Sequence, residues 1–207
     1  MRTDEILIVG ISGGSAAGKT TVARLLAERL AARRATVLEV DRYFNDHSDL
    51  PEEQRSRLNY DVPEALDFGQ LARDLANLKL GRAIRAPEYD YAHHASRPGA
   101  ALIQPSPVVI VEGILLFHPP PVAPLLDYRI FVEAEREERL RRRIERDVAQ
   151  RGRTRESVIR QFNDTVEPAY LRYTAPTKAD ADAVLDWNTM NYTALDAIAE
   201  RIVGLLV

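Results

Sequence analysis

A glycine-rich segment near the start of the chain has the residue types and spacing of a phosphate-binding loop. The run Gly13-Gly14-Ser15-Ala16-Ala17-Gly18-Lys19-Thr20 fits the pattern G-x-x-x-x-G-K-[ST], and Thr21 follows it. Glycines let backbone N–H groups turn toward a polyphosphate, and a helix that begins at the lysine adds its positive end. We predict that residues 13–21 bind ATP or GTP, with Lys19 as a catalytic cation on the β- and γ-phosphates and Thr20 as a Mg²⁺ ligand.

Two acidic residues follow buried, strand-like runs further along the chain. Asp41 comes directly after Thr36–Val40, and Glu112 comes directly after Val108–Val111. Ligands gather at the carboxyl ends of parallel strands, so both carboxylates are expected beside the phosphate loop. A carboxylate at the end of a buried strand is costly without a nearby cation, which favours Glu112 as a Mg²⁺ ligand. Asp41 suits the base of a phosphoryl transfer. The simpler alternatives are a turn acid for Asp41 and a backbone-satisfied buried acid for Glu112.

An arginine-rich segment follows near residue 136. Helical spacing places four arginines on one face, namely Arg139, Arg142, Arg143 and Arg146. Arg151-Gly152-Arg153 then interrupts the helix with a glycine between two guanidinium groups. This pattern predicts a lid over roughly residues 139–165 that brings cations to the transferring phosphate and excludes water. The alternative is a solvated helix held by i,i+4 ion pairs, because acids are interleaved with the arginines.

The scaffold that must position these residues alternates short apolar runs with helical patterns. Strands are predicted at Ile6–Ile11, Thr36–Val40, Val108–Val111, Tyr128–Val132 and Ala183–Asp186. Helical periodicity covers about Lys19–Ala32, Glu64–Leu80, Arg136–Ala149 and Thr193–Leu206. The alternation predicts an α/β protein with a mostly parallel five-stranded sheet flanked by helices, the P-loop NTPase fold. Residues Arg82–Pro107 give the weakest signal for regular structure because four prolines fall there, and such stretches are often functional.

Length and composition fit one soluble domain over residues 1–207. A net charge of −3 gives no overall attraction to nucleic acid or to anionic membranes. The apolar runs are too short for a signal segment or a membrane span, so a cytoplasmic protein is expected. The chain has no cysteine, which excludes disulfides and cysteine-ligated metal sites.

Taken together, these motifs resemble the uridine–cytidine kinase family, within the phosphoribulokinase/uridine kinase group of P-loop proteins. The resemblance runs from about Ile6 to Trp187. Besides the phosphate loop it covers Asp41–Phe44, Asn59–Asp67, Pro87–His94, Val111–Leu115, Arg142–Asp147, Arg151–Arg153, Gln161 and Pro176–Asp180. The Asn-aromatic-Asp-x-Pro and Tyr-Asp-aromatic-x-x-His segments are far more specific than the phosphate loop. The family converts uridine or cytidine to its 5′-monophosphate with ATP, and many members are tetramers, so the resemblance implies a nucleoside substrate and a homo-oligomer.

The resemblance also implies roles for particular positions. Asp41 matches the base toward the nucleoside 5′-hydroxyl, and Glu112 matches the metal-site glutamate. Asp61 and Arg143 match the pair that holds the ribose hydroxyls. The matching lid and pocket residues are Arg146, Arg151, Arg153 and Gln161.

A nucleoside-binding insertion is implied at roughly residues 59–107. There Tyr89 and His94 match residues that contact the pyrimidine, with Tyr60 and Tyr91 as aromatic neighbours. A neutral imidazole can donate at one nitrogen and accept at the other, so we expect both uridine and cytidine to be substrates.

Three positions depart from the family pattern. Val62 replaces a usual histidine, His93 leaves open which histidine faces the base, and one extra residue before Arg97 puts its contact with substrate in doubt.

Three other functions share some of these motifs. Asp67-Phe68-Gly69 and Ala86-Pro87-Glu88 resemble protein-kinase motifs, but no H-R-D loop precedes them and the phosphate loop is of another kind. A kinase of another metabolite, such as ribulose 5-phosphate or pantothenate, is disfavoured by the aromatic segment at Tyr89–His94. A P-loop ATPase switch would leave Asp41 without a task, because its nucleophile is already water.

Overall fold

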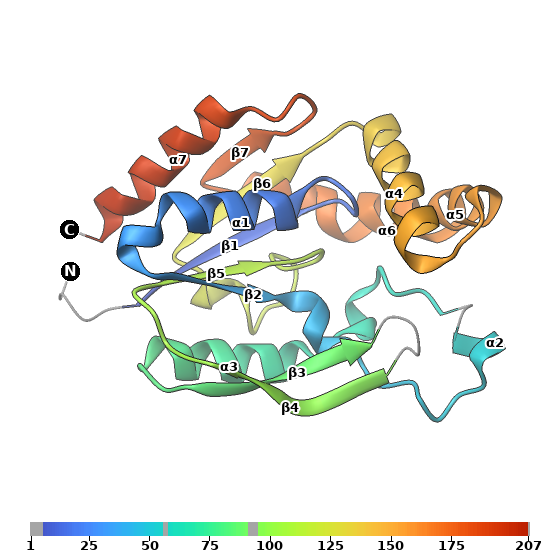
Figure 1. The fold of residues 1–207 in the computed structure, drawn as a ribbon, viewed down its shortest axis with the longest axis horizontal. Coiled ribbons are helices and arrows are strands. Elements are labelled where there is room, and N and C mark those ends of the chain that lie inside the picture. Colours follow the sequence, from blue (N-terminus) through green and yellow to red (C-terminus); the bar gives the residue numbers. More distant parts are fainter. Residues whose placement is uncertain (1–5, 56–57, 91–94, 207) are drawn as a thin grey trace.

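The fold is built around one five-stranded sheet, and the computed structural model describes residues 6–55, 58–90 and 95–206 (Figure 1). The strand order is β2-β5-β1-β6-β7, and every neighbouring pair is parallel. The strands are β1 (Leu7–Gly13), β2 (Ala35–Glu39), β5 (Val108–Glu112), β6 (Tyr128–Glu133) and β7 (Ala183–Asp186). The five predicted strands are therefore present to within two residues at each end, and the α/β fold is confirmed.

Helices cover both faces of this sheet, as the continuous apolar character of β1 and β5 requires. On one face α1 (Lys19–Arg29) and α7 (Tyr192–Leu205) enclose a core that includes Leu26 and Ile202. On the other face α3 (Phe68–Lys79) packs through Leu71 and Leu75. Figure 1 shows these helices on opposite sides of the sheet. The remaining helices are α2 (Glu52–Arg55), α4 (Arg136–Arg151), α5 (Arg155–Gln161) and α6 (Glu167–Ala169).

The helix expected over Glu64–Leu80 begins later, at Phe68. Asp67 is its N-cap, and its carboxylate accepts a hydrogen bond from the Gln70 N–H at 2.8 Å. A capped start of this kind satisfies one of the N–H groups that a helix leaves open. Pro63–Ala65 forms a separate 3₁₀ turn.

The expectation of little regular structure over Arg82–Pro107 was wrong. This segment holds β3 (Ile84–Asp90) and β4 (Ala95–Ile103), which pair antiparallel as a separate two-stranded sheet. The ladder shifts register between Ala86 and Glu88, at Pro87. Proline cannot donate to a ladder and is tolerated at such irregularities, so its presence did not exclude a strand.

The carboxyl ends of the parallel strands meet at one edge of the sheet. Ile11 pairs with Glu112, and Glu112 pairs with Glu39, so the carboxyl ends of β1, β5 and β2 lie side by side. The pair α4 and α5 stands over that edge (Figure 1). Its movement as a lid stays a prediction. Within the described ranges, the chain contains no helix that is long and apolar enough to cross a membrane.

Candidate active site

The turn between β1 and α1 is shaped by glycines and by a tryptophan. Gly18 has a φ of +105°, and a Cβ added there would lie 2.5 Å from Cδ1 of Trp187. A Cβ on Gly13 would overlap the Val132 carbonyl oxygen. The Ala17 N–H donates to the Gly14 carbonyl at 3.1 Å and closes the turn just before the helix. This places the N-terminus of α1, the positive end of a helix, on the wall of a cavity.

Lys19 is held within this turn. It is 8% exposed, and its ammonium donates to the Gly14 carbonyl at 2.9 Å. Burial lowers the pKa of Lys19, and the negative charges of Glu112, Asp41 and Asp61 oppose that effect. The acceptor of this hydrogen bond is a neutral carbonyl, which an anionic phosphate oxygen could replace.

Glu112 and Thr20 form the candidate metal position. The Thr20 hydroxyl donates to Glu112 Oε1 at 2.7 Å, and Glu112 is 6% exposed. Burial raises the pKa of Glu112 to about 7, while Lys19 opposes the rise and Asp41 adds to it. A buried carboxylate that holds its proton this tightly, beside a hydroxyl, fits a hard divalent cation that would replace the proton.

The donor set is small, as Mg²⁺ prefers. Among residues 6–55, 58–90 and 95–206, no three histidine or acidic side chains gather as a metal cage. Mg²⁺ commonly takes one or two protein carboxylates and completes its shell with water and phosphate oxygens. Thr20 and Glu112 would be the protein ligands in that arrangement.

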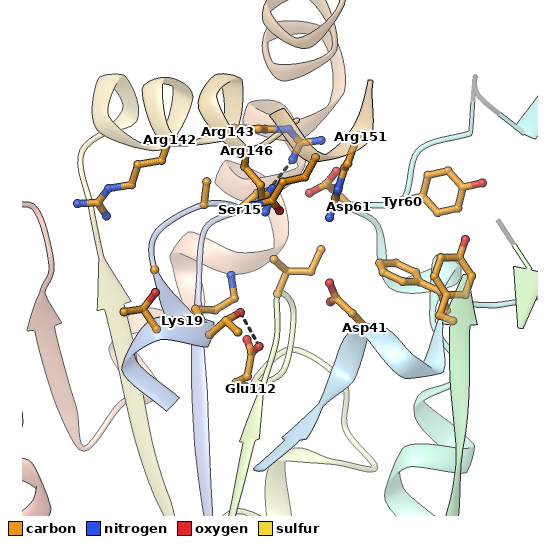
Figure 2. A pocket seen from close by; sticks show the side chains of 18 of the residues that line it. Ser15, Lys19, Asp41, Tyr60, Asp61, Glu112, Arg142, Arg143, Arg146 and Arg151 are labelled. Carbon is orange, nitrogen blue, oxygen red and sulfur yellow. Dashed lines mark hydrogen bonds between the residues drawn. The ribbon is translucent and has the colours of Figure 1, made fainter. Parts of the chain in front are cut away.

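Asp41 lies between the phosphate loop and the far wall of the cavity. It sits in a 3₁₀ helix over Val40–Tyr43 that follows β2, so its backbone does form part of a turn. Its side chain lines the cavity, and Figure 2 shows the carboxylate pointing into the open space across from Lys19. The negative charge of Asp41 acts to raise the pKa of Lys19, of Glu112 and of Asp61.

Asp61 and Arg143 line the same cavity, and their opposite charges act on each other. Arg143 is 6% exposed and donates to Ser15 Oγ at 2.6 Å and to Gln161 Oε1 at 3.1 Å. Burial lowers the pKa of Arg143, and Asp61 opposes this most strongly. Burial likewise raises the pKa of Asp61, and Arg143 is the main opposing charge. The pair therefore offers an acceptor, Asp61, and a donor, Arg143, that is held at the phosphate loop by Ser15.

The far wall of the cavity is aromatic. The ring centroids of Phe44 and Tyr89 are 5.2 Å apart, and those of Phe44 and Tyr60 are 5.8 Å apart with nearly perpendicular planes. Tyr89 is 8% exposed, and burial raises its pKa. Phe44 was not predicted to be a site residue. The signal was available, because Phe44 lies three residues after Asp41 and residues i and i+3 share a side of a 3₁₀ turn.

Part of the predicted base-binding segment cannot be compared with the structure. Tyr91, His93 and His94 lie outside the described residues. Arg97 is exposed on β4 opposite Glu88 and does not line the cavity.

Arginines from α4 and the turn after it form the roof of the cavity. The four that line it besides Arg143 are Arg142, Arg146, Arg151 and Arg153. Arg142 donates to the carbonyls of Ala17 at 3.1 Å and Trp187 at 2.8 Å, which ties the helix to the phosphate loop. Arg153 donates to Gln161 Oε1.

The expected arginine face needs one correction at Arg139. This side chain is buried, pairs with Glu167 at 2.9 Å and lies 4.0 Å over the Tyr170 ring. It supports the helix from behind and does not line the cavity.

One cavity of about 1030 Å³ joins all these groups. From the predicted phosphate loop it is lined by Ser15, Ala16, Gly18, Lys19, Thr20 and Thr21, whereas Gly13, Gly14 and Ala17 shape the turn from behind. The other predicted site residues on its wall are Asp41, Tyr60, Asp61, Tyr89, Glu112, Arg143, Arg146, Arg151, Arg153 and Gln161. Ile114 and Asp90 also line it and were not predicted. A cationic end and an aromatic end with a carboxylate between them suit the transfer of a phosphoryl group to a ring-bearing alcohol.

Comparisons with known proteins agree with this chemistry. The sequence profile of the Phosphoribulokinase / Uridine kinase family matches residues 8–194. A uridine kinase from Chloroflexus aggregans is 42% identical over 200 residues, which are 97% of this chain and 96% of that protein. A uridine kinase from Ligilactobacillus salivarius is 38% identical over 205 residues, 99% and 96% of the two chains. A crystal structure from Silicibacter sp. TM1040, provisionally described as a fructose transport system kinase, superposes with a TM-score of 0.72 at 26% identity. That superposition covers 88% of this chain and 91% of that one.

Proposed function

This chain belongs to the phosphoribulokinase/uridine kinase family, and we propose that it transfers the γ-phosphoryl group of ATP to the 5′-hydroxyl of uridine or cytidine. The observation that carries the proposal is the shared cavity of about 1030 Å³, which runs from the phosphate loop to the aromatic wall with Asp41 between them. An ATPase that uses water would need neither the aromatic wall nor a base at that position. The relatives named uridine kinase over nearly the whole chain support the choice of substrate.

In the proposed reaction the nucleoside 5′-oxygen attacks the γ-phosphorus, and the bond from that phosphorus to the β–γ bridging oxygen breaks. The hydroxyl proton passes to the Asp41 carboxylate, and ADP leaves with the bridging oxygen. Lys19 and the N-terminus of α1 offset the negative charge on the β- and γ-phosphates. Mg²⁺ bound through Thr20 and Glu112 would supply further charge neutralisation on the phosphate oxygens. GTP is an alternative donor that the same loop could hold.

The nucleoside would be held at two places. Asp61 accepts from the ribose hydroxyls and Arg143 donates to them, which uses the opposed charges of this pair. The pyrimidine would lie against Tyr60 and Tyr89, with Gln161 on the cavity wall. Tyr91 and His94 remain proposed base contacts on the resemblance alone.

The arginines of the roof would complete the site. Arg146, Arg151 and Arg153 are proposed to contact the transferring phosphate when the α4–α5 pair closes, which would also exclude water. As in the family it resembles, the chain is proposed to act in the cytoplasm and to assemble as a homo-oligomer, a tetramer in many members.

An acceptor screen with Mg²⁺ and ATP tests the proposal. ADP release is measured with no acceptor, and with uridine, cytidine, ribulose 5-phosphate or pantothenate in turn. We expect turnover that depends on uridine or cytidine, with the 5′-monophosphate as product. Turnover that needs one of the other two acceptors would assign a different metabolite kinase, and strong turnover without any acceptor would assign an ATPase.

A further inference from the structure

Helix α4 turns charged residues inward, and the most deeply buried of them is Asp147. The helix buries Arg139, Arg143 and Asp147, whereas Val148 is 44% exposed. Asp147 itself is 0% exposed. Burying a carboxylate is costly unless cations pair with it, so an acid retained in this place points to a task that an apolar residue could not perform.

Four arginines of the roof meet on this one residue. Asp147 Oδ1 accepts a hydrogen bond from Arg146 Nε at 2.9 Å and lies 3.6 Å from Arg151 Nη1. Asp147 Oδ2 lies 3.5 Å from Arg143 Nε. The backbone carbonyl of Asp147 accepts from the Arg153 N–H at 3.3 Å, where the helix ends. Every one of these arginines lines the cavity, and Asp147 does not.

The pairing with Arg143 is close but is not a hydrogen bond. Asp147 Oδ2 and Arg143 Nε are both buried, and neither has a hydrogen-bond partner within the part of the chain that the structure describes. The other two nitrogens of Arg143, Nη1 and Nη2, donate hydrogen bonds to Ser15 and Gln161. The carboxylate therefore reaches the one edge of that guanidinium that faces away from the site.

Neighbouring cations need such a partner. Guanidinium groups packed over one cavity repel each other, and each long side chain has many rotamers to lose. A carboxylate behind them offsets the repulsion and fixes their direction without occupying the nitrogens that face the phosphate. Figure 2 shows Arg143, Arg146 and Arg151 converging above Ser15.

We propose that Asp147 is a positioning residue that holds Arg143, Arg146 and Arg151 over the phosphate loop. It touches none of the reacting atoms and acts through these arginines. The consequence for turnover rests on the proposed kinase function, whereas the holding of the side chains does not.

The first test measures whether the arginines are held, and it needs no substrate. Wild type and Asp147→Asn are treated with phenylglyoxal, which modifies guanidinium groups, and the rate at each arginine is read by mass spectrometry. Exposed Arg172 is the internal reference. We expect Arg146 and Arg151 to react about threefold faster in the variant. Each loses a partly exposed ion pair with Asp147, and such pairs contribute little free energy, so the change in rate should be modest.

Glu145→Gln is the matched control on the same helix. Glu145 is exposed and pairs with Arg141 at 2.6 Å, away from the cavity. The substitution Glu145→Gln makes the same change of charge as Asp147→Asn. It should therefore speed the modification of Arg141 and leave the modification rates of Arg146 and Arg151 as in wild type.

The second test separates turnover from binding. In Asp147→Asn we expect kcat with uridine to fall about 10- to 100-fold, since misplaced catalytic groups cost that much. The Kd for Mg²⁺-ATP should stay within about threefold, because the cations remain near the phosphates and only their geometry is lost. A merely structural defect would weaken ATP binding and lower the melting temperature together with kcat. Should Asp147→Asn fail to fold, both tests are made on Asp147→Glu, whose added methylene moves the buried carboxylate away from its partners, so Arg146 and Arg151 should again react faster and kcat should again fall.

The outcomes are distinguishable. Unchanged reactivity of Arg146 and Arg151 in a folded Asp147→Asn variant, or in Asp147→Glu where that variant replaces it, would overturn the holding role. If phenylglyoxal modifies Arg146 and Arg151 faster in Asp147→Asn but kcat stays within about threefold of the Glu145→Gln control, the positioning role is overturned. A wild-type protein that phosphorylates no nucleoside would defeat the proposed function and leave the modification result to decide the holding role.

Discussion

The buried Glu112 should make the stability of the protein depend on pH in a way that one substitution removes. Its pKa is about 7 in the folded protein, against 4.5 for an unperturbed glutamate. The folded state therefore holds this proton more tightly than the unfolded state. The stability that the protonated form provides is fully present below about pH 4.5 and is lost as the pH rises through 7. At about 1.36 kcal/mol per pKa unit, the gap of about 2.5 corresponds to about 3 kcal/mol.

The perturbation is Glu112→Gln, which fixes the side chain in a neutral state of the same shape. Urea unfolding of wild type and variant is measured at about pH 4.5 and pH 8, without Mg²⁺ or nucleotide. We expect the difference in unfolding free energy between the two proteins to change by about 3 kcal/mol over this range, with wild type losing the stability. Asp61 also has a raised pKa, but it is present in both proteins, so its contribution largely cancels.

Glu145→Gln controls for the loss of an acid as such, because Glu145 is 62% exposed on its side chain and should leave the pH profile as in wild type. A free-energy difference for Glu112→Gln that stays constant from about pH 4.5 to pH 8 would refute the reasoning. It would mean that Glu112 is ionised in the folded protein at neutral pH without a metal.

Three further predictions concern substrate and nucleotide. If Asp61 and Arg143 hold the ribose hydroxyls, kcat/KM for 2′-deoxyuridine should be at least about 100-fold below that for uridine, because buried polar groups would be left unpaired; equal values would remove that assignment. Uridine and cytidine should both be turned over, with kcat/KM values within about a thousandfold, because a neutral imidazole can donate to one base and accept from the other; a larger preference would contradict this expectation. Gly18→Ala should lower stability by about 1–3 kcal/mol in thermal unfolding and weaken Mg²⁺-ATP binding, since φ there is +105° and Trp187 leaves no room for a Cβ. Gly204→Ala, with nothing within 4 Å of the added Cβ, is the control, and equal effects of the two substitutions would contradict the prediction.

The phosphate loop and its two acids could be predicted because their chemistry is local in sequence and their placement follows from a general rule. An apolar strand ending in a glycine-rich turn fixes where Lys19 lies, and parallel strands bring their carboxyl ends to one edge. Although the strand order was not predicted from the sequence, that rule alone predicted Glu112 and Asp41 beside the loop. The register pairs of Glu112 with Ile11 and Glu39 show this directly.

The roof of the cavity was harder to predict from sequence. Hydrophobic periodicity assumes that a helix buries its apolar side, yet α4 buries Arg143 and Asp147 and exposes Val148. No helix was predicted for the segment after it, which runs as helix and wide π turns from Arg155 to Thr174 and buries Val158, Phe162 and Val166. In α4 charge, rather than apolar burial, determines which side faces inward.

The base at the centre of the proposed reaction is tested most directly by Asp41→Asn, with Asp49→Asn, an exposed acid in the loop that follows, as control. The measurement is kcat for uridine with saturating Mg²⁺-ATP, alongside the Kd for Mg²⁺-ATP. Loss of a proton acceptor in line with the attacking hydroxyl should lower kcat by about 10²- to 10⁴-fold and leave the Kd within about threefold. A kcat within about threefold of the Asp49→Asn control would contradict the account, because the 5′-hydroxyl would then lose its proton elsewhere.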